Sequence, residues 1–253
     1  MSSSASRRGE IFLHRGDLSK ARFWYEQAVT EARLMESPQA LSEALGNLGN
    51  VCALSENFEQ AEACYREVLD IQRTLQEGNA IGETLVNLGN LKTDTDQPEK
   101  ARAYYLEAID VLTPLENYRA LGILYGNLAL QELQLHRPQL AIDAFHTALE
   151  YHRKIGNEDG LATTYGQLGK TFLITGQPQK AEACLNNATE HFTKLGNGSG
   201  EAGALRLLAD VYLEREDHIS ALRCLERVVQ IDRTYQLPQY EEDRQRYMSL
   251  RQS

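Results

Sequence analysis

Cysteine and histidine are the side chains of this sequence best suited to hold a metal ion or to act as a nucleophile with its base. The cysteines are Cys52, Cys64, Cys184 and Cys224; they form no C-x-x-C pair and have no histidine at ligand spacing. The six histidines form no H-E-x-x-H motif, and no P-loop or dinucleotide-binding glycine pattern exists. We therefore expect no enzyme, no metal site and no cofactor, with the cysteines as small structural residues.

Asparagine is the other residue whose placement raises a chemical question. Two apolar stretches, "ALGNLGN" at 44–50 and "TLVNLGN" at 84–90, each contain a pair of asparagines, although asparagine is a mediocre helix former. The four residues are Asn47, Asn50, Asn87 and Asn90. A carboxamide carries two donors and an acceptor with two lone pairs. A row of them could pair with the N–H and C=O groups of an extended chain, which is recognition rather than catalysis.

The composition is that of a folded protein: of 253 residues, 42% are hydrophobic and 25% are charged. There are 26 Lys and Arg against 36 Asp and Glu, a net charge of −10. This balance disfavours nonspecific binding to nucleic acid or to anionic membranes. No apolar run approaches the roughly 20 residues of a membrane span, and the N-terminus lacks a secretory signal pattern. We expect a cytoplasmic protein with no nucleic acid partner and no membrane insertion.

The elements that position these residues repeat every forty positions, without insertion or deletion. An alanine recurs at Ala21, Ala61, Ala101, Ala141, Ala181 and Ala221. Twelve residues earlier a small residue recurs at Gly9, Gly49, Gly89, Ala129, Gly169 and Ala209. Four residues after each alanine a large apolar residue recurs at Tyr25, Tyr65, Tyr105, Phe145, Leu185 and Leu225. Self-similarity at such a period is the signature of a repeat architecture.

Each repeat reads as a pair of helices. In the second copy, Leu45, Leu48, Gly49 and Cys52 follow the i, i+3, i+4, i+7 spacing of one helix face, and the segment from Ala61 to Val68 continues the pattern on a second helix. Polar turns separate the two, and three of these turns end in a proline suited to the first turn of a helix. These prolines are Pro98, Pro138 and Pro178. The small residues allow two helix axes to approach closely.

The motif Tyr165-x-x-Leu168-Gly169-x-x-Phe172, followed by Ala181-x-x-x-Leu185, resembles the tetratricopeptide repeat (TPR). The copies here have 40 residues rather than 34 and lack the proline that closes the second helix. This variant is similar to the repeats of kinesin light chains, of spindle-orientation adaptors and of bacterial peptide-sensing regulators. The resemblance implies an all-α fold, a right-handed α-solenoid of about six TPR helix pairs with a C-terminal capping helix.

The predicted repeats span residues 1–40, 41–80, 81–120, 121–160, 161–200 and 201–237. The first is degraded, since Ala5 and Arg8 stand where bulky apolar residues belong. Polar substitution of this kind suits a terminal repeat, and truncation from a longer parent is an equally good explanation. Residues 238–253 read as the closing helix, with Tyr240, Tyr247 and Leu250 on one face.

The resemblance also implies a concave groove lined by the first helix of each pair. Asn47, Asn87 and Asn127, with Gln167 as a longer substitute, would form a ladder of carboxamides in it. The predicted peptide-binding residues of the groove are Glu43, Asn47, Asn50, Glu83, Asn87, Asn90, Asn127, Gln167, Lys170 and Arg206. The same groove positions also hold Asp94, Ile123, Leu130 and Thr163. An alternative is left open: the asparagines could hydrogen-bond to a neighbouring helix and set the angle between repeats.

We predict a noncatalytic protein–protein interaction module, or scaffold, that binds an extended peptide segment of a protein partner in this groove. Acidic groove residues in the first half favour basic side chains there, whereas Lys170 and Arg206 tolerate an acidic one later. Two alternatives remain: a regulatory protein that senses a signalling peptide, and a self-assembling structural scaffold. We expect a monomer, with self-association left open.

Overall fold

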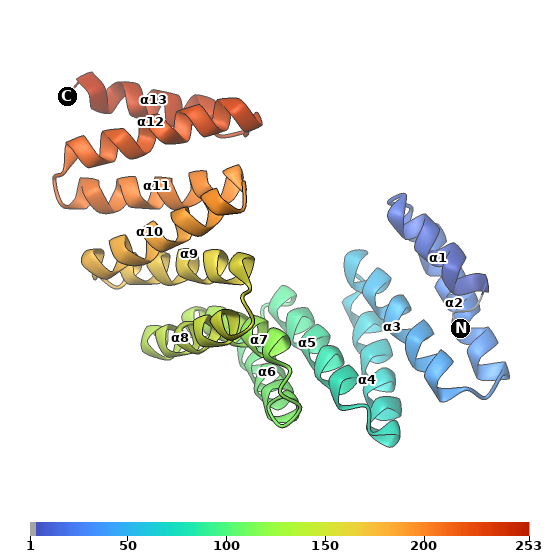
Figure 1. Ribbon diagram of the computed structural model, residues 1–253. Coiled ribbons are helices and arrows are strands. Elements are labelled where there is room, and N and C mark those ends of the chain that lie inside the picture. The colour runs from blue at the N-terminus through green and yellow to red at the C-terminus, as the bar shows by residue number, and fades with distance from the viewer. Residues whose placement is uncertain (1–3, 253) are drawn as a thin grey trace. The chain divides into compact units, whose positions relative to one another are not determined.

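The computed structural model describes residues 4–252, and in this part of the chain there are thirteen α-helices and no strand. The helices form two compact units, one ending at Asn117 and the other beginning at Tyr118 (Figure 1). The predicted all-α class, helix pairs with a helix at the C-terminus, is confirmed. Where one repeat ends and the next begins remains a prediction.

The N-terminal unit contains α1 to α6. Their bounds are α1 Ser4–His14, α2 Leu18–Leu34, α3 Pro38–Leu54, α4 Phe58–Leu75, α5 Gly78–Asp94 and α6 Pro98–Leu112. The C-terminal unit contains α7 Tyr118–Gln134, α8 Pro138–Lys154, α9 Glu158–Ile174, α10 Pro178–Lys194, α11 Gly198–Glu214, α12 His218–Tyr235 and α13 Tyr240–Gln252. Within each unit, every helix packs against the next one along the chain.

Local sequence explains where the helices begin. The Asn57 side chain accepts a hydrogen bond from the backbone N–H of Gln60 at 3.4 Å, which caps α4. Asp217 caps α12 in the same way through Ser220 at 3.0 Å. The helices α6, α8 and α10 have no side-chain cap and instead carry proline in their first turn, as predicted.

A residue with positive φ follows each of the first twelve helices, and these residues recur every twenty positions. They are Gly16, Glu36, Glu56, Gln76, Asp96, Glu116, His136, Gly156, Gly176, Gly196, Glu216 and Gln236. This left-handed conformation lets the chain leave the helix and is a natural place for glycine. Eight of the twelve are not glycine, and a side chain there costs about 1 kcal/mol.

We predict that Glu56→Gly stabilises the protein by about 0.5–1 kcal/mol, because glycine adopts the observed φ of 57° without steric cost. The matched control is Gly176→Ala, at φ 69°, which should destabilise by a similar amount. A Cβ at Gly176 would meet no atom within 4 Å, so the backbone conformation alone decides its effect. Urea unfolding followed by circular dichroism measures both; stability changes of equal sign would contradict the prediction.

The repeated columns form the core. All six column alanines are 0% exposed. The column glycines lie against the large residue of the second helix, and a Cβ placed on Gly49 would stand 2.7 Å from the ring of Tyr65. The small residues are therefore required by close helix packing, as the sequence indicated.

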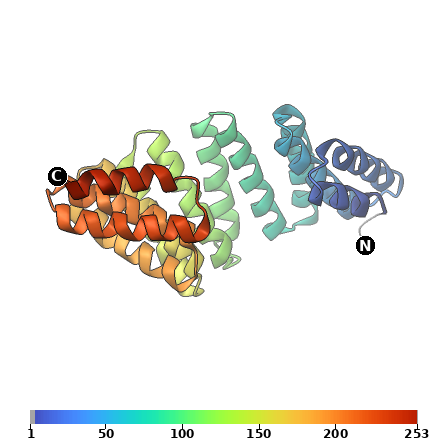
Figure 2. The same cartoon turned by 90° about the horizontal axis from the view of Figure 1, so that it is seen from above.

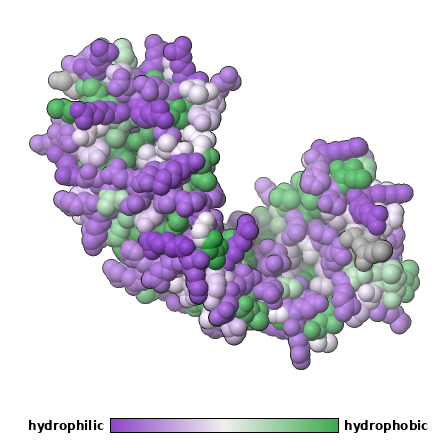
Figure 3. Space-filling model, in the orientation of Figure 1, coloured by the Kyte–Doolittle hydropathy of each residue, from purple (hydrophilic) through white to green (hydrophobic). Residues whose placement is uncertain are grey.

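The face of the molecule seen in Figure 3 is mainly hydrophilic. In the view of Figure 3 polar and charged side chains cover most of each unit, and apolar residues form small separate patches. Individual apolar side chains near helix ends, such as Leu34 and Ile174, are exposed. Scattered residues of this kind are normal on a folded protein.

The closing helix differs from its prediction in what it buries. α13 packs along α12 (Figure 2), but Tyr240, Tyr247 and Leu250 are only half-buried. The fully buried side chain of α13 is an acidic one, Asp243, whose carboxylate accepts a hydrogen bond from Arg206 at 2.7 Å. Ion pairs therefore contribute to holding this helix, beside a modest apolar contact.

The cysteines lie on the packed faces of their helices. Cys52 and Cys64 are buried, and Cys184 and Cys224 are half-buried. Burial raises the pKa of the Cys184 thiol and of the Cys224 thiol to about 11. Thiols with such values stay protonated at neutral pH, which makes them poor nucleophiles and poor metal ligands.

Candidate functional site

In the N-terminal unit, predicted groove residues of α3 and α5 meet at one cavity of about 280 Å³. Its lining includes Asn50, Asn87, Asn90 and Asp94. The cavity opens beside Leu54, an exposed apolar residue at the end of α3. Glu43 and Asn47 line another cavity of the same unit, next to α1. The fold therefore brings five of the six predicted residues of this unit to open cavities, whereas Glu83 lines neither of the two.

The four asparagines of this unit divide into two kinds. Asn50 accepts a hydrogen bond through Oδ1 from the hydroxyl of Tyr65 at 2.8 Å, and Asn90 accepts one from Tyr105 at 2.7 Å. Each of these bonds ties the first helix of a pair to the second. For Asn50 and Asn90, the bond to a neighbouring helix that the alternative proposed is present, but it lies within one helix pair and not between repeats.

Asn47 and Asn87 are half-buried, and neither side chain has a hydrogen-bond partner within residues 4–252. The same is true of the Asn127 and Gln167 side chains in the C-terminal unit. An amide group that is partly shielded from water and lacks an internal partner is available to pair with an external one.

Charged groove residues also differ in their availability. Glu83, Asp94 and Lys170 are exposed, and none of the three has an ion pair in the described part of the chain. Glu43 is exposed and lies in the cavity beside Asn47.

Arg206 requires a correction. Its guanidinium donates to Asp232 and to Asp243, each at 2.7 Å, so it is occupied by two carboxylates of its own chain. The sequence offered Arg206 as a cation for a ligand, but in the structure it joins α11 to α12 and α13. The physical reason is that both carboxylates lie on later helices, and the repeat spacing does not predict contacts between side chains of different helices.

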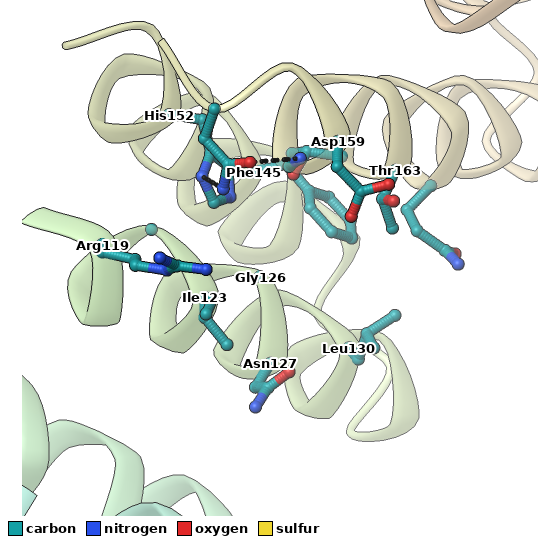
Figure 4. Close-up of a pocket in the computed structure, with 14 residues that line it drawn as sticks. Arg119, Ile123, Gly126, Asn127, Leu130, Phe145, His152, Asp159 and Thr163 are labelled. Carbon is teal, nitrogen blue, oxygen red and sulfur yellow. Dashed lines mark hydrogen bonds between the residues drawn. The ribbon is translucent and has the colours of Figure 1, made fainter. Parts of the chain in front are cut away.

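The C-terminal unit holds a cavity of about 380 Å³ between α7, α8 and α9 (Figure 4). From α7 come Ile123, Asn127 and Leu130, and from α9 come Thr163 and Gln167, all of them at first-helix positions that the resemblance places in the groove. Phe145 and His152 of α8 close the cavity from the side of the second helix.

His152 was not predicted as a site residue. It is 3% exposed, and its imidazole fits against two glycines: a Cβ on Gly122 would stand 2.7 Å from the ring, and one on Gly160 only 2.5 Å. The sequence carried no clear signal, because the equivalent position of the other repeats is mixed in type: Ala32, Gln72, Leu112, Phe192 and Asp232.

Arg119 and Asp159 complete the polar lining and were also missed. They belong to the first turns of α7 and α9, outside the groove columns that the family pattern supplied. Neither forms an ion pair with any described residue. In Figure 4 the Arg119 guanidinium lies near His152, whereas the Asp159 carboxylate lies on the other side, near Thr163.

No described helix is both long enough and apolar enough to cross a bilayer. Between residues 4 and 252 there is also no cluster of three or more His, Cys, Asp or Glu side chains arranged to hold a metal ion.

Several solved structures are similar to this chain. BtubC (BKLC) from P. vanneervenii has a TM-score of 0.79 at 21% identity, covering 87% of this chain and 92% of that one. A STAND protein with a tetratricopeptide repeat sensor from Pyrococcus horikoshii has a TM-score of 0.85 at 15% identity, and the match covers 97% of this chain and 38% of that one. A putative kinesin light chain from Podospora anserina with TPR-like repeats has a TM-score of 0.65 at 15% identity, and the match covers 79% of this chain and 97% of that one. These likenesses show the fold.

No curated protein matches the chain. The tetratricopeptide repeat family model matches residues 40–113, 120–194 and 173–234. Together these segments cover well over half of the sequence and include helices of both units. The chain therefore belongs to the tetratricopeptide repeat family.

Proposed function

We propose that this protein is a noncatalytic interaction module that binds an extended segment of a protein partner along the first helices of its repeats. The observation that carries the proposal is the set of partly buried carboxamides without an internal partner. These are Asn47 and Asn87 in the N-terminal unit, and Asn127 and Gln167 in the C-terminal unit. We infer a cytoplasmic location and a monomer, both from the sequence.

The chemistry of these groups favours an extended backbone as ligand. A carboxamide offers donors and an acceptor at once, which matches the alternating N–H and C=O groups of a peptide that has no internal hydrogen bonds. Glycine next to the amide, as at Gly46 and Gly126, leaves space, since a Cβ on either would meet no atom within 4 Å. Free carboxylates on Glu83 and Asp94 favour a segment that carries basic side chains at the N-terminal unit.

A second candidate function is a sensor that binds a short signalling peptide and changes state. It is supported by the likeness to the repeat sensor of the Pyrococcus horikoshii protein, of which this chain covers 38%. Both functions need the same peptide contacts. They differ in whether the ligand alters the protein, and a change in small-angle scattering on saturation with peptide would favour the sensor.

The test compares two double variants on the same two helices. Ligands are selected with the wild-type protein from a displayed library of random extended peptides and are measured by titration calorimetry. Asn47→Ala with Asn87→Ala should weaken binding roughly 5- to 100-fold, because two neutral hydrogen bonds of about 0.5–1.5 kcal/mol each are lost. Its stability should stay unchanged, since neither side chain has an internal partner.

The matched control is Asn50→Ala with Asn90→Ala. Asn50→Ala should lower the free energy of unfolding by about 0.5–1.5 kcal/mol, because the buried Tyr65 hydroxyl loses its acceptor, and Asn90→Ala should cost less, because the Tyr105 hydroxyl keeps Thr93 as a partner at 3.2 Å. The control should weaken binding less than the first double variant, because the Oδ1 atoms of Asn50 and Asn90 are already bonded within the protein. Failure of the library to yield any sequence-specific peptide would overturn the proposal. So would equal losses of affinity in the two double variants.

A further inference from the structure

The wall of the cavity of the C-terminal unit carries a hydrogen-bond donor that the fold does not use. The starting point is Asn157, at the N-cap of α9, whose Oδ1 accepts from the backbone N–H of Gly160 at 3.1 Å. This bond orients the carboxamide, and its Nδ2 then lies 3.1 Å from Nδ1 of His152. Because Nδ2 can only donate, Nδ1 of His152 accepts, and the ring proton must reside on Nε2.

The imidazole is neutral at physiological pH. Burial lowers the pKa of His152, and the nearby Asp159 carboxylate opposes that shift only in part. The other charged group that faces the ring is Arg119 on α7. The Nε2–H group of this nearly fully buried side chain has no acceptor among the described residues, although it belongs to a ring that lines the cavity. The Nε2 atom is not among the enclosed polar atoms of the described chain that lack a partner, so its N–H reaches the cavity and is available to an acceptor there.

A second donor reaches the same space. In Figure 4 the Arg119 guanidinium extends from α7 toward the cavity on the His152 side, and it has no ion pair within residues 4–252. Ile123 lies close to it and supplies an apolar wall. This end of the cavity therefore combines one neutral donor, one cation and an apolar surface.

We propose that this end of the cavity binds a carboxylate of the partner segment, with the His152 Nε2–H and the Arg119 guanidinium as its donors. The inference rests on the proposed function and adds the chemistry of one residue of the ligand. A single cation and a neutral donor match the single charge of a carboxylate, whereas a phosphate dianion would need more positive charge and would be repelled more strongly by Asp159. Asp159, which lies near Thr163, accepts N–H groups of the same segment.

The experiment uses small probes and so does not depend on knowing the partner. The full chain, with its histidines labelled with ¹³C, is titrated with N-acetylglutamate N′-methylamide, which represents an acidic side chain inside a peptide. N-acetylglycine represents a C-terminal carboxylate, and N-acetylglutamine N′-methylamide is the neutral control. The Cε1–H signal of His152 is identified by its absence in His152→Gln.

We expect saturable shifts of the His152 signal with one or both carboxylate probes and none with the neutral probe; the stronger of the two identifies the source of the carboxylate. The bound carboxylate should also raise the pKa of His152, because a neighbouring negative charge favours the imidazolium. Arg119→Gln should lower the affinity for the carboxylate probe at least tenfold. Arg223→Gln removes the same charge from an exposed position of α12 outside the cavity and should leave the affinity unchanged.

The proposal is overturned if His152 responds equally to the neutral probe, if neither carboxylate shifts its signal, or if Arg223→Gln weakens binding as much as Arg119→Gln. These outcomes leave the interaction-module function intact, because that function is tested by peptide selection and by Asn47 and Asn87 on other helices. Conversely, a carboxylate response without selected peptides would retain the pocket and remove the extended-segment function.

Discussion

Replacing Arg206 with methionine should destabilise the C-terminal unit by about 3–5 kcal/mol at pH 7, a large effect for one substitution. Arg206 lies 2.7 Å from Asp232 and 2.7 Å from Asp243. The Asp232 side chain is 0% exposed, and its Oδ2 is buried with no hydrogen-bond partner in the structure as described. Methionine preserves most of the packing volume but leaves two buried carboxylates without their cation.

The effect should depend on pH in a defined direction. Burial raises the pKa of Asp232 even beside Arg206, and the loss of the guanidinium removes its main opposing influence. In the variant the folded-state pKa therefore lies further above the unfolded value. A carboxyl group whose pKa is raised by folding contributes its full stability below its unfolded-state pKa. It loses that contribution as the pH rises through its folded-state pKa. The loss of stability caused by Arg206→Met, relative to the wild type, should consequently become smaller as the pH is lowered from 7 to about 4.

Amide hydrogen exchange of α11 to α13, followed by mass spectrometry at both pH values, measures this change locally. The matched control is Arg246→Met, which removes another cation that joins α13 to α11. Its partner Asp210 is 42% exposed, so the control should cost less than about 1 kcal/mol. Equal effects of the two variants, or a deficit that grows on acidification, would show that the Arg206 cluster is not what holds this end of the unit.

Replacing Ala101 with leucine should destabilise the N-terminal unit by about 1–3 kcal/mol, because three additional carbon atoms must enter a site that is already filled. Ala101 is 0% exposed in the interface between α5 and α6. Ala103 lies two residues later on the same helix and is exposed, so Ala103→Leu should change stability by less than about 0.5 kcal/mol. Urea unfolding measures both variants; a wild-type midpoint for Ala101→Leu would contradict the assigned role of the alanine column.

Most of the fold could be predicted from the sequence, because the information is local and repeated. The helix-period spacing around Leu48 and Ala61 marks the buried face of each helix, and the prolines at 98, 138 and 178 mark helix starts. Column glycines such as Gly49 indicate close packing before the partner is known. Six copies of one pattern make the helix pairs apparent even where a single copy would be ambiguous.

The candidate site could be predicted only in part. The spacing identified which residues share the first-helix face, and several of them line cavities, as Asn87 does in the N-terminal unit and Asn127 in the C-terminal one. It did not distinguish Asn47 from Asn50, three positions apart on the same helix. That distinction depends on the Tyr65 hydroxyl, which the second helix brings within 2.8 Å of Asn50.

The sequence alone thus determined the family, the helix pairs, the buried columns and the face of each repeat that carries the asparagines, because periodicity reports which way a side chain points. The tertiary structure decided which of those side chains remain free. Arg206 is neutralised by carboxylates 26 and 37 residues further along the chain, whereas His152 is oriented by Asn157 and left with an unused donor. Such pairings depend on side-chain distances between neighbouring helices, and the repeat pattern, which fixes positions along each helix, does not encode them.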